Sequence, residues 1–107
     1  MIRHIVFWKF LEQAEGAHRE ENLRLAKGLL EGLKGEIPEI LELEVGIDIT
    51  RIPASFDLVL NSLFRDVESL AAYQAHPAHL KVVEFLRKVQ STRAVTDYLT
   101  DYVVENP

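Results

Sequence analysis

Residues 2–10 combine β-branched and aromatic side chains with basic interruptions, and this pattern predicts a strand. One face of that strand carries Ile2, His4, Val6, Trp8 and Phe10. The opposite face carries Ile5 and Phe7. Since both faces are largely apolar, we expect both to be covered in the folded protein.

The next two elements differ in the spacing of their apolar residues. In residues 18–33, leucine and alanine recur at three- and four-residue steps, which predicts an amphipathic helix ended by Gly35 and Pro38. In residues 41–48, apolar residues alternate with Glu, Gly and Asp, which predicts a strand with one solvated face.

The second half of the chain repeats the order of strand, helix and strand. Residues 56–64 are apolar on both sides and predict a central strand. Asp66 is placed to cap a helix, and Pro77 suits the first turn of a further helical piece that reaches about Val89. Residues 94–104 predict the last strand.

The predicted order is therefore βαββαβ, which is typical of the ferredoxin-like α+β fold. Such an order gives a four-stranded antiparallel sheet with helices on one face. No linker rich in Pro, Gly or Ser divides the sequence, so we expect a single domain over residues 1–107.

Helices on one face leave the other face of the sheet without cover. We expect that face to expose Ile5, Phe7, Val59 and Leu63, or the residues opposite them. An exposed apolar face of this kind usually marks an interface. The sequence therefore predicts a homodimer through the sheet face, a dimeric α/β barrel, since two identical faces can cover each other across a two-fold axis.

Composition and charge exclude several classes of partner. The net charge is -5 with scattered basic residues, which argues against nucleic acid. There is no cysteine, so disulfides and thiolate metal ligands are excluded. No apolar run approaches the roughly 18 residues of a membrane span, and basic residues interrupt the first ten. We expect a cytoplasmic protein that binds no membrane.

His4 is the first candidate for chemistry, because it shares the strand face of Val6 and Trp8. Burial there favours the neutral ring, which has one nitrogen able to accept a proton next to a carbonyl. The alternative is a structural histidine bonded to a backbone carbonyl or to Asp97. Asp97 itself either orients a histidine or is an edge-strand charge that discourages aggregation.

A second set of polar residues surrounds Pro77. His79, one turn into the last helix, is placed to pair with His4 as acid and base, or else to make a helix-terminal contact. Tyr73 is a candidate donor to an enolate oxygen, or an amphipathic residue with a solvated hydroxyl. His76 favours an N-cap role. The His-x-x-His spacing has no third ligand at a suitable distance, so we expect no metal.

Three segments of the chain resemble one known family. They are Arg3-His4-Ile5-Val6-Phe7-Trp8-Lys9-Phe10, Tyr73-Gln74-Ala75-His76-Pro77-Ala78-His79 and Val95-Thr96-Asp97-Tyr98. Together they look like the stress-responsive A/B barrel (Dabb) family over nearly the whole chain. Its members are mostly plant stress-induced and uncharacterised bacterial proteins, and at least one plant member is a polyketide cyclase. The resemblance implies catalytic roles for His4, Tyr73 and His79.

The resemblance also has a departure. The cyclase-type pattern carries a tyrosine on the first helix where this chain has Leu30, and no tyrosine lies between His18 and Leu33. This argues against polyketide cyclisation itself. The expected ligand contacts are Trp8, Val6, Leu30, His76 and Asp97.

We therefore expect a small, largely apolar, carbonyl-bearing ligand and cofactor-free acid-base chemistry of the lyase, isomerase or cyclase kind. No Gly-rich phosphate loop, nucleophile elbow or dinucleotide motif is present, so no cofactor is expected. One alternative is a non-enzymatic stress or assembly protein in which the same residues brace the fold. Another is a cofactor-free monooxygenase of the related antibiotic-biosynthesis barrels.

Overall fold

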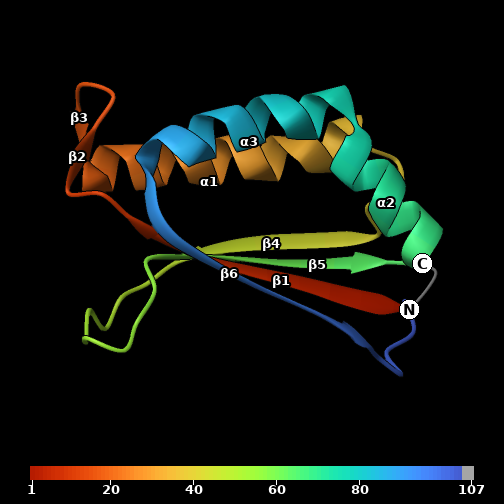
Figure 1. The fold of residues 1–107 in the computed structure, drawn as a ribbon. Coiled ribbons are helices and arrows are strands. Elements are labelled where there is room, and N and C mark those ends of the chain that lie inside the picture. Colours follow the sequence, from red (N-terminus) through yellow and green to blue (C-terminus); the bar gives the residue numbers. More distant parts are fainter. Residues whose placement is uncertain (105–107) are drawn as a thin grey trace.

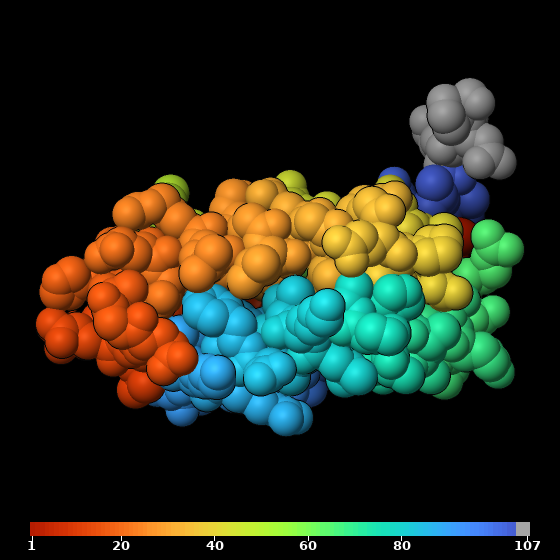
Figure 2. Space-filling view, turned by 90° about the horizontal axis from the view of Figure 1, so that it is seen from above, coloured from red at the N-terminus to blue at the C-terminus, as the bar shows by residue number. Residues whose placement is uncertain are grey.

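The computed structural model of the chain describes residues 1–104, which fold into a sheet layer and a helix layer (Figure 1). The main sheet has the order β4-β5-β1-β6. Its strands are β1 (Ile2–Phe10), β4 (Glu42–Ile47), β5 (Leu58–Phe64) and β6 (Gln90–Leu99). The helices are α1 (Arg19–Glu36), α2 (Val67–Ala75) and α3 (Pro77–Val89). Seen from above, α1 and α3 lie side by side across the sheet (Figure 2).

The predicted fold class is confirmed. Every pairing in the main sheet is antiparallel, and β1 and β5 are the two central strands. One element was not predicted, a hairpin of β2 (Gln13–Ala14) and β3 (Ala17–His18) between β1 and α1. Its two turn residues, Glu15 and Gly16, both have positive φ angles of 52° and 75°, as tight hairpin turns require.

The strand register decides which side chains face the helices. Directly paired residues of antiparallel strands point to the same side of a sheet. His4 pairs with Asp97 on β6 and with Ser62 on β5, while Trp8 pairs with Arg93 on β6. Because His4 and Trp8 are buried beneath the helices, Asp97 and Arg93 lie on the helix-covered side as well.

Two predicted boundaries were wrong by several residues. The first helix continues through Gly35 to Glu36, because Ile37 is buried and its N–H donates to the Leu33 carbonyl at 2.9 Å. The last strand spans residues 90–99 instead of 94–104, since its pairing with β1 begins where Gln90 lies opposite Phe10. This shift brings Arg93 into the strand.

The helix starts agree with the sequence analysis. Asp66 caps α2 by accepting a hydrogen bond from the Ser69 N–H at 2.8 Å. Ser69 lowers the pKa of the Asp66 carboxyl, first through its side-chain hydroxyl and then through this N–H. His76 ends α2 and begins α3, where its Nδ1 accepts from the Ala78 N–H at 3.0 Å. This bond confirms the predicted N-cap role of His76, which fixes the direction in which α3 leaves.

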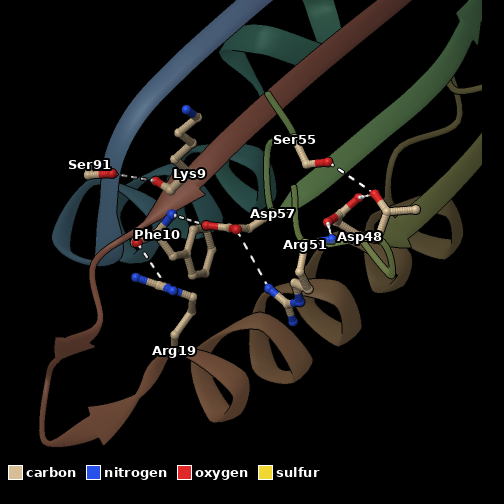
Figure 3. Close-up of polar contacts among 9 residues, drawn as sticks. Lys9, Phe10, Arg19, Asp48, Arg51, Ser55, Asp57 and Ser91 are labelled. Carbon is tan, nitrogen blue, oxygen red and sulfur yellow. Dashed lines mark hydrogen bonds and ion pairs between the residues drawn. The ribbon is translucent and has the colours of Figure 1, made fainter. Parts of the chain in front are cut away.

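The loop between β4 and β5 is tied to the end of β1 (Figure 3). Asp57 accepts a hydrogen bond from the Phe10 N–H at 2.7 Å and pairs with Arg51 at 3.6 Å. Arg19 donates to the Phe10 carbonyl at 3.2 Å. The backbone groups at the end of β1 are therefore satisfied by side chains from the loop and from α1.

The helix-free face of the sheet is apolar in part. Ile5 and Val59 lie there half-buried, and the Phe7 side chain is 38% exposed. The expectation that Leu63 is exposed on this face was wrong, because the residue is 0% exposed. It lies between its strand partners Arg3 and Glu42, and Tyr102 contacts both of these neighbours. Residues after β6 thus cover this end of the open face.

None of the helices in residues 1–104 is long and apolar enough to cross a membrane.

Candidate functional site

A cavity of about 420 Å³ lies between the helix layer and the sheet. Six of the predicted site residues line it together: His4, Val6, Trp8, Leu30, Tyr73 and His79. They come from β1 and from all three helices, so they meet only in the folded chain. A cavity of this size is within the range that holds small-molecule ligands.

His4 lies at the floor of the cavity and is held by a carboxylate. The residue is 2% exposed, and Nδ1 lies 2.5 Å from Oδ1 of Asp97. In the neutral ring this contact places the proton on Nδ1, so that Nε2 is the nitrogen able to accept one. Asp97 does not line the cavity itself and contacts only His4 among the residues that do.

Tyr73 supplies a hydroxyl with no hydrogen-bond partner within residues 1–104, although its residue is only 1% exposed. Burial raises the pKa of Tyr73 to about 12, and the positive charge of Arg93 offsets part of that rise. The phenol is therefore protonated at neutral pH. It is available to donate a hydrogen bond to an oxygen atom in the cavity.

His79 lies against Tyr73, with 4.4 Å between the ring centroids. Its Nδ1 is 3.1 Å from the Gln74 carbonyl oxygen and donates to it, which leaves Nε2 as the acceptor nitrogen. Burial lowers the pKa of His79, opposed by the Gln74 bond and assisted by the nearby charges of His4 and Arg93. A neutral imidazole thus lies beside a protonated phenol.

Of the other predicted site residues, three line the cavity with apolar side chains and one, His76, does not line it. Val6, Trp8 and Leu30 are buried and make the cavity apolar on the side of β1 and α1. The Trp8 indole N–H is buried with no acceptor within residues 1–104. His76 is not among the lining residues, because its ring is turned to the backbone of α3 as the N-cap.

The sequence analysis missed four polar residues of the lining: Gln74, Arg87, Gln90 and Arg93. A signal was available for Arg93, because residues 93, 95 and 97 alternate along the last strand and therefore share one face. The register confirms that placement.

No group of three or more His, Asp or Glu side chains suited to a metal ion exists in the part of the chain that the structure describes. The groups gathered in the cavity are instead a proton acceptor, a proton donor and guanidinium groups. Such a set suits proton transfer at a carbonyl compound.

The family model for the stress responsive A/B barrel domain, which describes the sequences of that family, matches residues 2–100 of this chain. The chain belongs to this family. An uncharacterized protein of Streptomyces coelicolor is 32% identical over 100 residues, which cover 92% of this chain and 98% of that protein.

Solved structures share the fold. A dimeric protein of unknown function with a ferredoxin-like fold from Bacteroides fragilis has a TM-score of 0.76 at 27% identity, covering 91% of this chain and 93% of that one. Hydroxynitrile lyase from Passiflora edulis has a TM-score of 0.77 at 20% identity, covering 97% of this chain and 96% of that one. At 20% identity the second likeness shows the fold alone.

Proposed function

We propose that this family member binds a small, largely apolar carbonyl compound in the cavity and moves a proton on it without a cofactor. The observation that carries the proposal is the contact between a neutral His79 and a protonated Tyr73 above the buried His4. A base and a hydrogen-bond donor side by side are the two groups that enolisation requires.

The proposed step begins with Nε2 of His79. It takes a proton from the carbon next to the carbonyl, and the electron pair of that C–H bond moves to form the enolate. The Tyr73 hydroxyl donates a hydrogen bond to the enolate oxygen, where negative charge develops. In an isomerisation of a conjugated enolate, the carbonyl re-forms, the electron pair moves along the conjugated chain, and His79 returns the proton to the carbon at its far end. In a lyase reaction, the carbonyl re-forms, a carbon–carbon double bond forms to the next carbon, the bond from that carbon to its leaving group breaks, and His79 gives the proton to the leaving group.

His4 has a supporting place in this scheme. Its ring centroid lies 6.0 Å from that of Tyr73, and its Nδ1 is occupied by Asp97. Nε2 of His4 is then a second acceptor at the floor of the cavity.

The hydroxynitrile lyase of Passiflora edulis supports the proposal, because that lyase has the same fold.

A second function has one specific observation in its favour. The bond between His4 and Asp97 is also what a histidine that only braces two strands would make. Under this alternative the protein is a non-enzymatic stress or assembly protein. Replacing His79 or Tyr73 would then change the stability of the protein, and neither the wild type nor the variants would catalyse proton transfer.

Deuterium exchange separates the two functions. The probe is 4-phenylbutan-2-one in D₂O, followed by NMR for loss of the protons next to its carbonyl. We expect the protein to accelerate this exchange, and His79→Ala to lower the acceleration about 100-fold, the usual contribution of a general base. Tyr73→Phe should lower it as well, because the enolate oxygen loses its donor.

Two variants outside the cavity are the controls. Tyr98→Phe alters an exposed tyrosine on the open sheet face, and His18→Asn removes an exposed imidazole while keeping a residue suited to a helix N-cap. Both should exchange the probe like the wild type. Exchange no faster than in buffer would exclude the proposed activity, and a thermal shift by the same ketone would still report binding.

We also infer a homodimer through the open sheet face. Ile5, Phe7 and Val59 are apolar residues without helical cover, and beside them lies a hollow of about 510 Å³ lined by Phe7, Phe56 and Ile47 among others. The dimeric Bacteroides fragilis protein has the same fold. Association would remove this apolar surface from water.

A further inference from the structure

The cavity carries a basic residue that the proposed proton transfer does not use. Arg93 lies on β6 opposite Trp8, on the same side of the sheet as His4 and Asp97. Its side chain lines the cavity together with Arg87, which comes from α3. Two guanidinium groups from different elements, β6 and α3, therefore line the same cavity.

Neither guanidinium has an ion-pair or hydrogen-bond partner within residues 1–104. The lining residues include no Asp or Glu, although the whole chain has a net charge of -5. The nearest acidic residue along β6 on this face, Asp97, is engaged with His4. The cavity is thus a positively charged concave site on an acidic protein, which favours an anionic ligand.

Arg93 is also electrostatically coupled to the proposed chemistry. Its positive charge acts on both Tyr73 and His79, in each case lowering the pKa as a smaller effect beside that of burial. A guanidinium that acts on both residues and lines the same cavity is able to hold a carboxylate of the ligand while the ligand's carbonyl meets Tyr73 and His79. The planar fork of arginine matches a carboxylate with two parallel hydrogen bonds.

We infer that the ligand of this cavity is an apolar oxo-carboxylate, whose carboxylate is bound by Arg93 and whose carbonyl faces Tyr73 and His79. The inference rests on the proposed function and adds the substrate class to it. Arg93 is a specificity-determining residue in this scheme, since it reads the anionic end and takes no part in the proton transfer.

The test compares two probes with the same phenyl and carbonyl groups. One is 4-phenylbutan-2-one, which is neutral, and the other is 2-oxo-4-phenylbutanoate, which adds a carboxylate. Calorimetric titration measures Kd for both. We expect the keto acid to bind about tenfold more tightly than the ketone, as a charge-assisted bond to a partly exposed guanidinium allows.

Variants assign that difference to one side chain. Arg93→Gln should abolish the preference, so that this variant binds the keto acid and the ketone with the same Kd, whereas Arg93→Lys should retain part of the preference. Arg24→Gln removes the same charge from an exposed position of α1 outside the cavity lining, and it should bind both probes like the wild type. Melting temperatures of all variants check that each is folded.

The outcomes separate this inference from the function on which it rests. Equal affinity for both probes in the wild type would overturn the carboxylate assignment and leave the ketone site standing. A preference for the acid that survives in Arg93→Gln would overturn the role of Arg93. Displacement of the keto acid by inorganic phosphate at the same concentration would overturn carboxylate selectivity. Failure of both probes to bind would count against the proposed function as well.

Discussion

Asp97 on the edge strand β6 and His4 on the neighbouring strand β1 are directly paired in the sheet. The 2.5 Å contact between Oδ1 and Nδ1 joins residues 93 positions apart in the sequence. His4 is buried whereas the Asp97 side chain is 40% exposed, so the carboxylate approaches the histidine from the solvent side. This pair sets which nitrogen of His4 is left for the cavity.

Asp97→Asn should therefore change the tautomer of His4. An amide still occupies the position, but it can present its NH₂ to Nδ1 and so favour the proton on Nε2. We expect a loss of about 1 kcal/mol of stability, reduced by the exposure of the carboxylate. Nitrogen chemical shifts of the imidazole measure the tautomer, and urea unfolding measures the stability.

The matched control is Asp101→Asn, which removes an exposed carboxylate beyond the end of β6. Its His4 spectrum should equal that of the wild type. If Asp97→Asn also left the His4 signals in place, the carboxylate would have no part in setting the ring.

The sequence predicted the strand face that carries this site and offered Asp97 as a partner of His4, which the structure confirms, but it did not predict how the helices complete the cavity. Alternation along residues 2–10 placed His4, Val6 and Trp8 on one face, and the register confirms that they share it. The places of Tyr73 and His79 followed from the family resemblance. That both line the same cavity as His4 depends on how α2 and α3 pack on the sheet, an arrangement of distant segments that periodicity does not specify.

Arg93 and Leu63 show why the rest was missed. The predicted last strand began one residue after Arg93, so the arginine was not assigned to any face. The true start depends on the pairing of Gln90 with Phe10, which is fixed by the tertiary structure. Leu63 was expected on an exposed face, and it is covered because Tyr102 bonds to Glu42 and lies against Arg3.

The lowered pKa of His79 makes a contribution to stability that depends on pH. Burial is the main cause of the shift, so the folded state holds the neutral ring more strongly than the unfolded chain does. Between the folded pKa and the unfolded value of 6.5, the unfolded state binds more protons, and stability falls as pH falls. This contribution is complete above 6.5 and is lost below it.

Urea unfolding across this pH range tests the sign. His79→Gln should lose less stability than the wild type as the solution is acidified through 6.5, because its side chain does not titrate. His79→Asn should give the same flatter profile. Parallel profiles for the wild type and both variants would mean that His79 is as easily protonated in the folded state as in the unfolded one.

Phe7 is the residue with which to test the homodimer. It is a large apolar side chain on the helix-free face, in contact with Phe56 at a ring separation of 5.8 Å. Phe7→Glu would place a charge in the proposed interface, and we expect it to shift sedimentation from dimer to monomer at micromolar concentration. Val67→Glu, an exposed apolar residue of α2 on the helix layer, should remain dimeric. A monomeric wild type would refute the interface.

His76 distinguishes a helix cap from a ligand contact. Its Nδ1 accepts the Ala78 N–H, so His76→Ala should destabilise the protein by about 1 kcal/mol, the typical value of a lost N-cap. His76→Asn should recover most of that loss, because asparagine is among the best N-cap residues. Both variants should bind 4-phenylbutan-2-one with the wild-type Kd, since His76 does not line the cavity. If His76→Asn is stable but binds the ketone more weakly than the wild type, then His76 contacts the ligand, as expected from the sequence. The start of α3 would then have to move toward the cavity when the ligand enters.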